Sequence, residues 1–398
     1  MQTPSQADRA ATESIEVRTD RIATGGEAVA RLEDGRVVFV RGALEAETVA
    51  IELTAEKKRF ARGRVTRVID PSNDRITPPC THAGNGDCGG CDWMHIAANT
   101  QVAYKVNIVR EQLTRLGKVT SPQVRAPAMP RGLRTTARCI VTNGRAGFRG
   151  HHSDAGFAAT MCKSVHPVLE ELIVDGRFGD ATEVTLRLGA ATGECMVLTN
   201  GSTQSVQVPP SVSIVSARDV GSAAIHERVA GRSWRISAES FFQTSLEGAE
   251  ALVGSVERSL AGSTGPLVDL YAGVGLLGGG AAPDRVTCAV ESGKSSVADA
   301  RHNLGEAVHV VQSQVERWTA TQFETVIADP ARRGLGAAAV AVIDATGASR
   351  LVLVSCDPAS LGRDTQLLAE HGWSYGGGEV IDMFPDTSRI EVVSSFSR

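Results

Sequence analysis

Aromatic residues are scarce in this sequence, at 4%, which argues against an extended platform on which nucleic-acid bases stack. Apolar runs are short as well. None reaches the ~18 residues that a membrane-spanning helix needs, which excludes an integral membrane protein. Neither sign of charge dominates, because 41 basic and 45 acidic residues leave a net charge of −4. This near balance argues against a protein that coats nucleic acid over its whole surface, but it permits local basic patches.

Cysteine is also sparse, with eight residues in 398, which are too few for a disulfide scaffold. In a reducing compartment, a clustered subset of cysteines indicates metal binding or catalysis. The first residues, MQTPSQADRAATESIEV, carry Asp8 and Glu13 and contain no apolar segment, so the sequence predicts neither a secretory signal nor a transit peptide. We therefore expect a soluble, cytoplasmic protein without a membrane partner. Its length predicts two or three domains of ~100 to 200 residues each.

A flexible tail is expected over residues 1–13, and residues 14–70 carry the pattern of a small five-stranded β-barrel. Short runs of alternating apolar and polar residues are separated there by turn residues such as Asp34 and Gly35. Within this segment, residues 57–67 contain six basic residues and no acidic residue. We interpret the group as a phosphate-binding stripe rather than as a solvated edge strand. Its members are Lys57, Lys58, Arg59, Arg62, Arg64 and Arg67.

Residues 71–235 are expected to form a central α+β domain. A loop with cysteines is followed by a predicted helix over about residues 98–116, where apolar residues recur at helical spacing. From residue 119 the pattern predicts short strands with glycine and proline between them. A second basic group without intervening acids lies in this part of the chain. It consists of Arg125, Arg131, Arg134 and Arg138, with Arg145 and Arg149 following.

Residues 236–398 have a different texture, in which apolar strands of five or six residues alternate with helical patterns. This alternation predicts a Rossmann-like, doubly wound parallel sheet. The predicted strands end in Gly, Asp, Glu or Cys. Ligands of such sheets bind beyond the carboxyl ends of the strands, so these residues are candidates for a site.

The segment VDLYAGVG joins an apolar strand to a glycine-rich turn that contains Gly273 and Gly275. The next strand ends in Glu291, and a carboxylate ~20 residues after the first strand accepts hydrogen bonds from a ribose in nucleotide-type folds. Gly278 stands at the third position of the pattern G-x-G-x-x-G, so the glycines alone admit either a dinucleotide or an adenosyl ligand without phosphates. Of the two, we expect the adenosyl ligand, S-adenosylmethionine. The alternative for Glu291 is an acid at a helix start beside Ser292.

Two further strand ends carry candidate chemistry. ADPARRG places Asp329 at one of them, and Ala331 and Arg332 stand where methyltransferases of amino groups have proline and an aromatic residue, which weakens that alternative. VSCDP places Cys356 at the same edge. A lone buried cysteine is usually inert, but a thiol in the ligand crevice, beside an arginine-bearing loop and a helix start, is expected to have a lowered pKa and to act as a nucleophile. The remaining strand cysteines are interpreted as structural: Cys139, Cys195 and Cys288.

A cysteine cluster with the spacing C-x7-C-x2-C comprises Cys80, Cys88 and Cys91. Three sulfur ligands need a fourth, and Cys162, in the proline-flanked segment MCKSVHP, is the best candidate. Four thiolates fit either a structural zinc ion or an iron–sulfur cluster, and the spacing does not decide between them. His95 and His166 are alternatives nearby that we interpret as ordinary polar residues. This cluster is therefore the expected metal site.

Six ordered motifs resemble those of the TRAM-containing uracil-C5 RNA methyltransferases. They are PPC…CGGC with the following histidine, SFFQ, DLYAGVG, DPARRG, LVSCDPASLGRD and DMFPDTSRIEVV, and they span the sequence from the barrel to the C-terminus. The resemblance implies that the barrel is an OB-like TRAM domain that holds RNA, that the cysteines carry a [4Fe-4S] cluster with a structural role, and that the product is 5-methyluridine. The implied methyl donor is S-adenosylmethionine.

The resemblance also implies a role for individual residues. Cys356 would be the nucleophile that adds to C6 of the uracil, and Glu391 the base that removes the C5 proton. The residues implied in S-adenosylmethionine binding are Gln243, Tyr271, Glu291 and Asp329. The chain departs from the family at three positions, where Asn, Cys and His are frequent, and these changes place substrate choice in question. The three are Ser245, Ala272 and Arg389.

The expected partner is RNA, with ribosomal RNA preferred over transfer RNA, and nothing in the sequence demands more than a monomer. Two other classes stay open. One is an RNA-binding module whose transferase domain has decayed. The other is a transferase that acts on a small molecule or a protein, which the two arginine-rich stretches disfavour.

Overall fold

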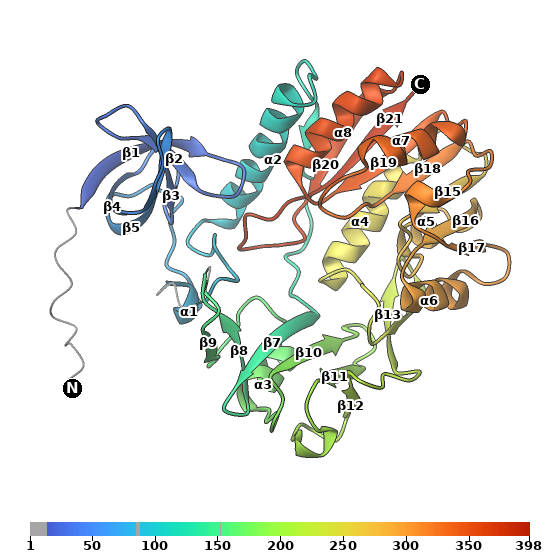
Figure 1. Ribbon diagram of the computed structural model, residues 1–398, viewed down its shortest axis with the longest axis horizontal. Helices are drawn as coiled ribbons and strands as arrows, with labels where there is room; N and C mark the ends of the chain where they lie inside the picture. The colour runs from blue at the N-terminus through green and yellow to red at the C-terminus, as the bar shows by residue number, and fades with distance from the viewer. Residues whose placement is uncertain (1–13, 85–87, 152) are drawn as a thin grey trace.

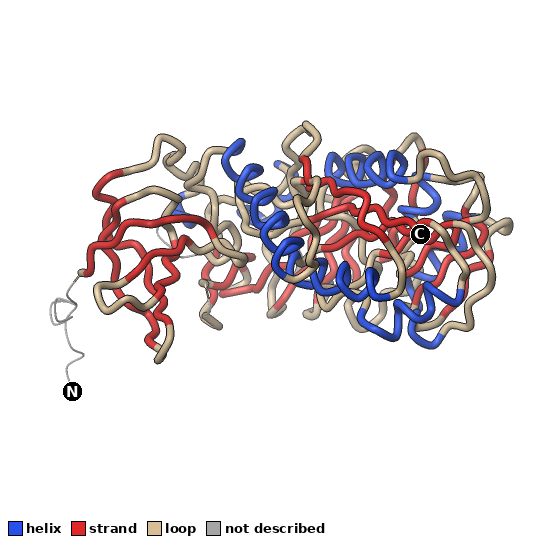
Figure 2. Tube along the Cα trace, turned by 90° about the horizontal axis from the view of Figure 1, so that it is seen from above, coloured by secondary structure: helices blue, strands red, loops and turns tan. Residues whose placement is uncertain are grey.

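The computed structural model describes residues 14–84, 88–151 and 153–398, and its strands form a closed barrel, two larger sheets and a two-stranded hairpin. The barrel lies at one end of the molecule and the largest sheet, with its helices, at the other. The smaller sheet lies below and between them (Figure 1). Seen from above, the parts form one elongated body (Figure 2).

The N-terminal barrel has five strands in the order β1-β2-β3-β5-β4, in which only β3 and β5 run parallel. Alternate side chains such as Val38, Val40 and Ile51 point inward and are fully buried. The hairpin turn at Gly35 has a positive φ of 83°, which glycine adopts without strain. The predicted five-stranded barrel is confirmed. Its strands are β1 (Ile15–Ile22), β2 (Ala28–Arg31), β3 (Val37–Arg41), β4 (Thr48–Glu56) and β5 (Phe60–Asp70).

The central sheet has six strands in the order β12-β11-β10-β7-β8-β9 and packs against one helix, α3 (Pro167–Asp175). Apolar residues of α3 such as Leu169 and Ile173 are fully buried in this core. The sequence predicted only strands here. The helix was missed because its nine residues are too few for a clear helical period. The strands are β7 (Thr136–Thr142), β8 (Arg145–Arg149), β9 (Gly156–Ala158), β10 (Glu183–Leu188), β11 (Cys195–Thr199) and β12 (Val212–Ser216).

The C-terminal sheet has eight strands in the order β17-β16-β15-β18-β19-β21-β20-β6. All neighbouring pairs are parallel except those of β21, which runs antiparallel between β19 and β20. The predicted doubly wound sheet is therefore present, with one antiparallel strand in it. Its strands are β15 (Leu267–Leu270), β16 (Val286–Glu291), β17 (His309–Gln312), β18 (Thr325–Ala328), β19 (Arg350–Ser355), β20 (Ser374–Ile381), β21 (Glu391–Ser397) and β6 (Val124–Arg125).

Helices cover both faces of this sheet because its strands are apolar on both sides. Val268 of β15 joins the core beneath α2, α7 and α8, whereas its neighbour Leu267 joins the core beneath α4, α5 and α6. The helices are α2 (Ala98–Arg115), α4 (Leu246–Ser259), α5 (Leu276–Ala281), α6 (Lys294–Leu304), α7 (Gly336–Ala345) and α8 (Pro358–Glu370). The hairpin β13 (Ala224–Val229) and β14 (Arg232–Ser237) precedes α4, and the short α1 (Thr81–Gly84) lies in the cysteine loop.

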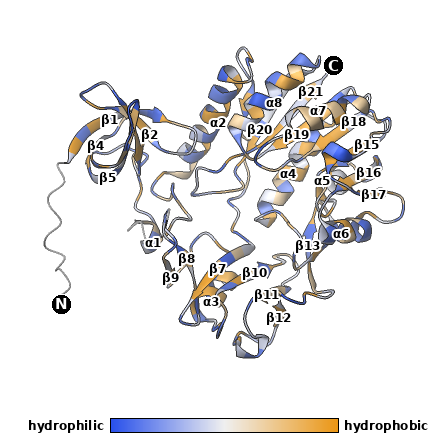
Figure 3. Ribbon diagram, viewed as in Figure 1, coloured by the Kyte–Doolittle hydropathy of each residue, from blue (hydrophilic) through white to orange (hydrophobic). Residues whose placement is uncertain are grey.

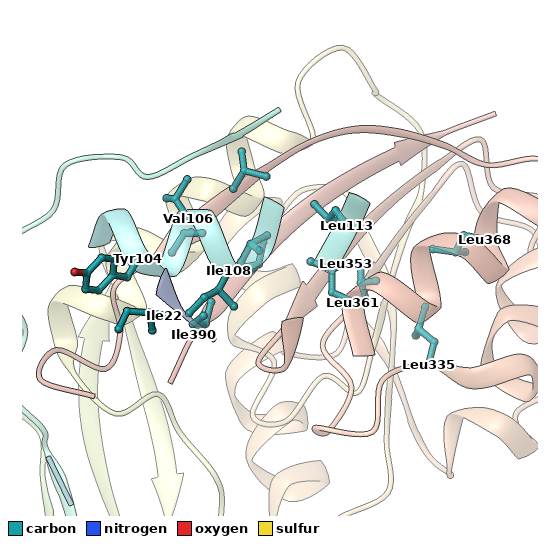
Figure 4. Packing of buried hydrophobic residues seen from close by; sticks show 14 of the residues in the cluster. Ile22, Tyr104, Val106, Ile108, Leu113, Leu335, Leu353, Leu361, Leu368 and Ile390 are labelled. Carbon is teal, nitrogen blue, oxygen red and sulfur yellow. The ribbon is translucent and has the colours of Figure 1, made fainter. Parts of the chain in front are cut away.

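Two segments before residue 126 belong to the C-terminal layer. The predicted helix α2 packs against α8, and Figure 4 shows its side chains Ile108 and Leu113 beside Ile390 and Leu361. Strand β6 pairs with the outer edge of β20. This arrangement differs from the expected division, in which residues 71–235 form one central domain. The chain enters the C-terminal layer, leaves it to build the central sheet, and returns.

The hydrophobic residues gather on the strands and on the inner faces of the helices, and hydrophilic residues face outward (Figure 3). Within the described ranges, no helix combines the length and the hydropathy that crossing a membrane requires.

Candidate active site

The carboxyl ends of the C-terminal strands meet at a cavity of about 870 Å³. Asp329 directly follows β18, Cys356 directly follows β19, and Glu391 begins the antiparallel strand β21 beside them. Neighbouring parallel strands place their ends at one edge of a sheet, which is why residues so far apart in sequence converge. All six side chains that were expected in catalysis and cofactor binding line this cavity: Gln243, Tyr271, Glu291, Asp329, Cys356 and Glu391.

The turn after β15 forms one wall of this cavity and is bound by Glu291. One carboxylate oxygen of Glu291 accepts a hydrogen bond from the Gly273 amide at 3.0 Å, and the other accepts one from the Gly293 amide at 2.6 Å. Tyr271 adopts a positive φ of 59°, which is strained for a residue with a side chain. The turn is thus fixed in a rare conformation by the carboxylate of the next strand.

A second cavity of about 190 Å³ adjoins the first and shares Tyr271, Glu291, Pro330 and Ala331 with it. Glu316 lines this smaller cavity, where it accepts hydrogen bonds from the Tyr271 hydroxyl at 3.2 Å and from Arg333 at 3.3 Å. Glu316 was not predicted from the sequence, since it lies in a short 3-10 turn outside any recognised motif. The two cavities together offer room for a nucleoside-sized ligand beside a second ligand.

Three carboxyl groups lie in or beside the site: Asp329 and Glu391 line the larger cavity, and the buried Asp269 lies within β15. Burial raises the pKa of Asp269 and that of Asp329 to about 7. Burial, together with the neighbouring Asp329, raises the pKa of Glu391 well above its ordinary value. Carboxyl groups this close in an apolar wall do not all ionise, because each charge disfavours the next. The ligand-free site therefore retains protons near neutral pH.

The same acids overturn one expectation about Cys356. Its thiol was expected to have a lowered pKa, but burial and the adjacent Glu391 and Asp329 raise that pKa to about 11, and Arg332 opposes them only in part. The arginine-bearing loop was visible in the sequence, whereas the proximity of Glu391 depends on how β21 inserts beside β19. Without a ligand, Cys356 is thus a protonated thiol.

An exposed aromatic residue stands at the mouth of the cavity. Phe241 is 63% exposed, the largest exposure among the large hydrophobic side chains of the described residues. The segment that carries it is anchored below: the Ser240 hydroxyl donates to the fully buried Asp299 of α6 at 2.6 Å. The motif SFFQ is visible in the sequence, but only its Gln243 was assigned a role. An exposed aromatic side chain next to a predicted binding residue was the available signal.

The loop from Asp382 to Ile390, which leads into Glu391, is held by other parts of the chain. Lys105 of α2 is fully buried and donates to Asp382 at 2.6 Å and to the Phe384 carbonyl at 2.9 Å. The Asp386 amide donates to Gln101 of α2 at 2.8 Å. The position of Glu391 therefore depends on α2, a helix far from it in the sequence.

Two residues of the cysteine loop also form hydrogen bonds with the loop from Asp382 to Ile390. The carboxylate of Asp92 accepts a hydrogen bond from the Ser388 amide at 3.0 Å. The amide of Trp93 donates to the Asp386 carbonyl at 2.9 Å, and its indole donates to the Gly26 carbonyl of the barrel at 2.9 Å. Barrel, cysteine loop and C-terminal loop are thus fastened together beside the cavity.

The three positions at which the chain departs from the family have different surroundings. Ser245 caps α4, where its hydroxyl accepts a hydrogen bond from the Gly248 amide at 3.1 Å, and Ala272 is buried in the core. Arg389 lines the cavity. Only the last of these changes therefore alters the cavity wall. Asp357, a second carboxylate that lines the cavity, caps α8 by accepting a hydrogen bond from the Ser360 amide at 2.7 Å.

The four cysteines that were expected to bind a metal line one cavity of about 230 Å³ between the cysteine loop and the central sheet. Among the described residues, however, no group of three or more His, Cys, Asp or Glu side chains is close enough together to hold a metal ion. Burial raises the pKa of the Cys88 thiol and that of the Cys91 thiol, the latter to about 12. The structure thus assembles Cys80, Cys88, Cys91 and Cys162 around a common space without closing a site.

Several residues of the two basic groups, which have no acid among them in the sequence, form ion pairs in the structure. Arg62 pairs with Glu27 and Arg64 with Glu52. In the second group, four of the arginines pair with acids from other segments, which sequence proximity cannot reveal. These pairs are Arg125–Glu379, Arg131–Asp386, Arg138–Glu183 and Arg149–Glu183.

A doubly wound sheet, a turn held by the carboxylate of the next strand, and a deep cavity at the strand ends define a methyltransferase-type fold, here preceded by a small barrel. The TRAM domain family matches residues 12–66. An uncharacterized RNA methyltransferase of Streptomyces coelicolor is 33% identical, and the alignment covers 96% of this chain and 92% of the relative. A second uncharacterized RNA methyltransferase, from Thermosynechococcus vestitus, is 29% identical, with 96% of this chain and 97% of the relative covered. The chain belongs to this family of RNA methyltransferases.

A solved structure has the same architecture over nearly the whole chain. It is the Pyrococcus abyssi tRNA (uracil-54, C5)-methyltransferase in complex with S-adenosyl-L-homocysteine, with a TM-score of 0.74 and 20% identity, and the match covers 96% of this chain and 99% of that one. At this identity the likeness establishes the fold.

Proposed function

We propose that this protein transfers a methyl group from S-adenosylmethionine to C5 of a uridine in RNA. The observation that carries the proposal is that Cys356 and Glu391 open on the same cavity as the turn held by Glu291. A thiol and a carboxyl group are the two groups that methylation of a uracil carbon requires, because C5 of uracil is a poor nucleophile. A uracil-C5 methyltransferase with the same fold supports the assignment.

The cofactor would occupy the smaller cavity and the adjoining part of the larger one. Glu291 would bind the ribose, Tyr271 would lie against the nucleoside, and Gln243 and Asp329 would border the methyl-bearing end. When bound, S-adenosylmethionine supplies the methyl group and a sulfonium charge, which favours the ionised forms of nearby thiol and carboxyl groups. The raised pKa of Cys356 therefore fits a thiol that ionises after the ligands bind.

The chain's own residues then act in sequence. The sulfur of Cys356 forms a bond to C6 of the base, and the electron pair of the C5–C6 double bond moves onto C5 and the adjacent carbonyl. C5 takes the methyl group, while the bond from that methyl to the sulfonium sulfur breaks and its electron pair stays on the sulfur, which leaves S-adenosylhomocysteine. Glu391 removes the proton from C5, and the electrons of that bond restore the double bond while the C6–S bond breaks and returns the thiolate. Glu391 is suited to hold that proton because its pKa lies well above the ordinary value.

The base must leave any stacked arrangement to reach Cys356, so the expected target is a single-stranded or remodelled loop. Phe241 stands at the entrance with most of its ring exposed and would stack on the extruded base or its neighbour. Ribosomal RNA is our first choice of substrate. Transfer RNA, the substrate class of the Pyrococcus abyssi enzyme, is the alternative.

The test combines activity with trapping. Purified protein and labelled S-adenosylmethionine are incubated with RNA from cells that lack the protein, and 5-methyluridine is mapped. An RNA of the mapped sequence that carries 5-fluorouridine should form a denaturation-resistant adduct, because fluorine at C5 leaves no proton to remove. Methylation at a nitrogen or on ribose, or label in protein instead of RNA, would contradict the proposal.

We further propose that the cysteine cavity binds a [4Fe-4S] cluster with a structural role, zinc being the alternative. Four thiols from two segments facing one space are a donor set that suits either group. The reaction needs no redox step, so the cluster would fasten the cysteine loop to the central sheet. Anaerobic purification with metal and sulfide analysis decides: about four iron and four sulfide per chain support the cluster. A colourless protein with one zinc excludes it.

A further inference from the structure

A third cavity, of about 350 Å³, lies between the barrel and the cysteine loop, outside the active site. Arg41 at the end of β3, Arg64 on β5 and Arg75 after β5 line it from the barrel side. Asp92 and His95 line it from the cysteine loop. Because three arginines line this one cavity, it is a candidate site for an anion.

The charges around this cavity are not equally satisfied. Arg75 is bound by the buried carboxylate of Glu47 at 2.6 Å, and Arg64 is paired with Glu52. Arg41 differs: within the described part of the chain, its guanidinium has neither an ion pair nor a hydrogen bond. Burial lowers the pKa of Arg41, and Asp92 offsets this only in part. A half-buried cation without an acid partner is costly unless a ligand compensates it.

His95 supplies an independent sign of a missing ligand. Its Nε2 atom is buried and has no hydrogen-bond partner among the described residues. Burial, with Arg75 nearby, lowers the pKa of His95 to about 4, so the ring is neutral at pH 7 and can donate one hydrogen bond. Buried polar atoms are normally satisfied. Arg41, with an unpaired guanidinium, and His95, with an unpaired imidazole nitrogen, thus line the same cavity.

This cavity and the active-site cavity are linked by a hydrogen bond between residues that line them. Asp92 lines the third cavity, and its carboxylate binds the amide of Ser388, which lines the active site. Gly25 of the barrel also lines the active site, while the carbonyl of Gly26 beside it binds Trp93. An RNA strand that enters the active site past Gly25 would therefore lie next to the third cavity.

We propose that the cavity at Arg41 and His95 binds a phosphodiester of the RNA strand close to the target uridine, as an anchor point separate from the active site. This inference rests on the proposed RNA substrate. A phosphodiester offers two anionic oxygens, one for the guanidinium and one for the imidazole N–H. The neighbouring Arg64 and Arg75 stay bound to Glu52 and Glu47, so Arg41 supplies the charge that pairs with the phosphodiester.

The experiment measures RNA affinity and its salt dependence for Arg41→Gln. Arg36→Gln is the matched control, because Arg36 precedes β3 and Arg41 ends it, and Arg36 is already paired with Asp34 and Glu56. We expect Arg41→Gln to weaken binding about tenfold and to lower the log–log salt slope by about 0.7 to 0.9, the share of one phosphate contact. The control should retain the wild-type slope, and both should bind S-adenosylmethionine like the wild type.

A second measurement locates the contact. A series of RNAs carries a single uncharged methylphosphonate linkage, on a 2′-O-methyl nucleotide for chemical stability, at successive positions around the target. One position should weaken wild-type binding about tenfold and leave Arg41→Gln unaffected. Arg41→Lys, which keeps the charge, should restore the slope but only part of the affinity, since a lysine cannot reproduce the guanidinium geometry.

Failure of this inference is distinguishable from failure of the proposed function. If wild type methylates uridine but Arg41→Gln matches Arg36→Gln in slope and in the linkage series, the cavity does not bind the RNA backbone. The inference fails equally if inorganic phosphate binds at Arg41 while RNA affinity is unchanged by the substitution. If wild type binds no RNA, both proposals fall. Circular dichroism and S-adenosylmethionine affinity show that the variants are folded.

Discussion

Two cavities of this protein are defined by cysteine, and they are in different states. Around Cys356, side chains at the ends of β15, β16, β18, β19 and β21 line one cavity, and the turn beside them is fixed by hydrogen bonds. Around Cys80, Cys88, Cys91 and Cys162, the thiols share a space but are not arranged to hold a metal ion. The first is built on strand ends, and the second on loops.

The difference teaches how each site is stabilised. Strand ends are positioned by the ladder of backbone hydrogen bonds and by a core on either face, so a site built on them exists before its ligand arrives. A loop has no such ladder, and the free energy of metal binding commonly completes its fold. We therefore expect changes in the first cavity to alter chemistry and changes in the second to alter structure and RNA affinity.

The largest effect is expected for Cys356→Ala, which should lower methylation about ten-thousandfold, the scale for loss of a nucleophile, while S-adenosylmethionine affinity changes less than about twofold because the thiol bonds only to the base. Single-turnover methylation and calorimetry measure the two effects. Cys288→Ala, inside β16 of the same sheet, is the control. Retained turnover in Cys356→Ala would contradict the assignment of Cys356 as the nucleophile. It would also contradict the expectation that changes in this cavity alter the chemistry.

Glu391→Gln should slow turnover by about a hundredfold or more and leave a methylated adduct between protein and RNA, because addition and methyl transfer need no base but elimination does. A denaturation-resistant band on gels is the readout. Asp357→Asn is the comparison, since that side chain caps α8, and it should lower stability without accumulating the band. Equal turnover in Glu391→Gln and wild type would place the base elsewhere.

Cys88→Ser tests the loop-built cavity. We expect loss of bound iron and an RNA affinity about tenfold weaker, with S-adenosylmethionine affinity within about twofold of wild type. The reason is that the cysteine loop borders the barrel and the third cavity, whereas the cofactor residues lie on the sheet. Cys139→Ala, in β7, should retain the metal. If Cys88→Ser weakened cofactor binding as much as RNA binding, the two cavities would not be independent.

The smallest effect concerns pH. Burial raises the pKa of Asp269 from its ordinary 3.8 to about 7, so the folded state favours the protonated carboxyl. Its contribution to stability is complete below its ordinary value and is lost as the pH rises through about 7. Asp269→Asn should therefore raise the melting temperature relative to wild type by a few degrees at pH 8 and by less at pH 5. A difference independent of pH would show that Asp269 is ionised in the fold.

The strand-built site could be predicted from the sequence to a large extent because each strand end carries a local signal. Asp329 and Cys356 follow apolar runs directly, and the parallel sheet dictates that such ends meet. What failed was electrostatic: the pKa of Cys356 is set by Glu391, which reaches it through an antiparallel strand inserted between β19 and β20. Side-chain proximity of this kind depends on the order of the strands in the sheet, and the sequence around Cys356 does not reveal it.

Long-range pairing limited the other predictions in the same way. Arg125 and Arg131 stood in an apparently unpaired basic group, yet Glu379 and Asp386 neutralise them from the far end of the chain. Glu316 had no motif to mark it, and the two residues of β6 are too few for a period of two to register. The cysteines could be grouped by their spacing, but the spacing does not show whether the loops bring the thiols close enough together to hold a metal ion.

The short strand β6 has a consequence for cutting the protein into pieces. A fragment of residues 236–398 would lack β6 and α2, so the outer edge of β20 would present unpaired backbone groups at Gly378 and Glu379, and α8 would lose the apolar cover of α2. Exposed strand edges recruit other chains. Such a fragment should aggregate. When residues 98–125 are supplied as a separate chain, the fragment should stay dispersed. The transferase part is thus a composite of two stretches of the chain, with the central sheet as an insertion between them.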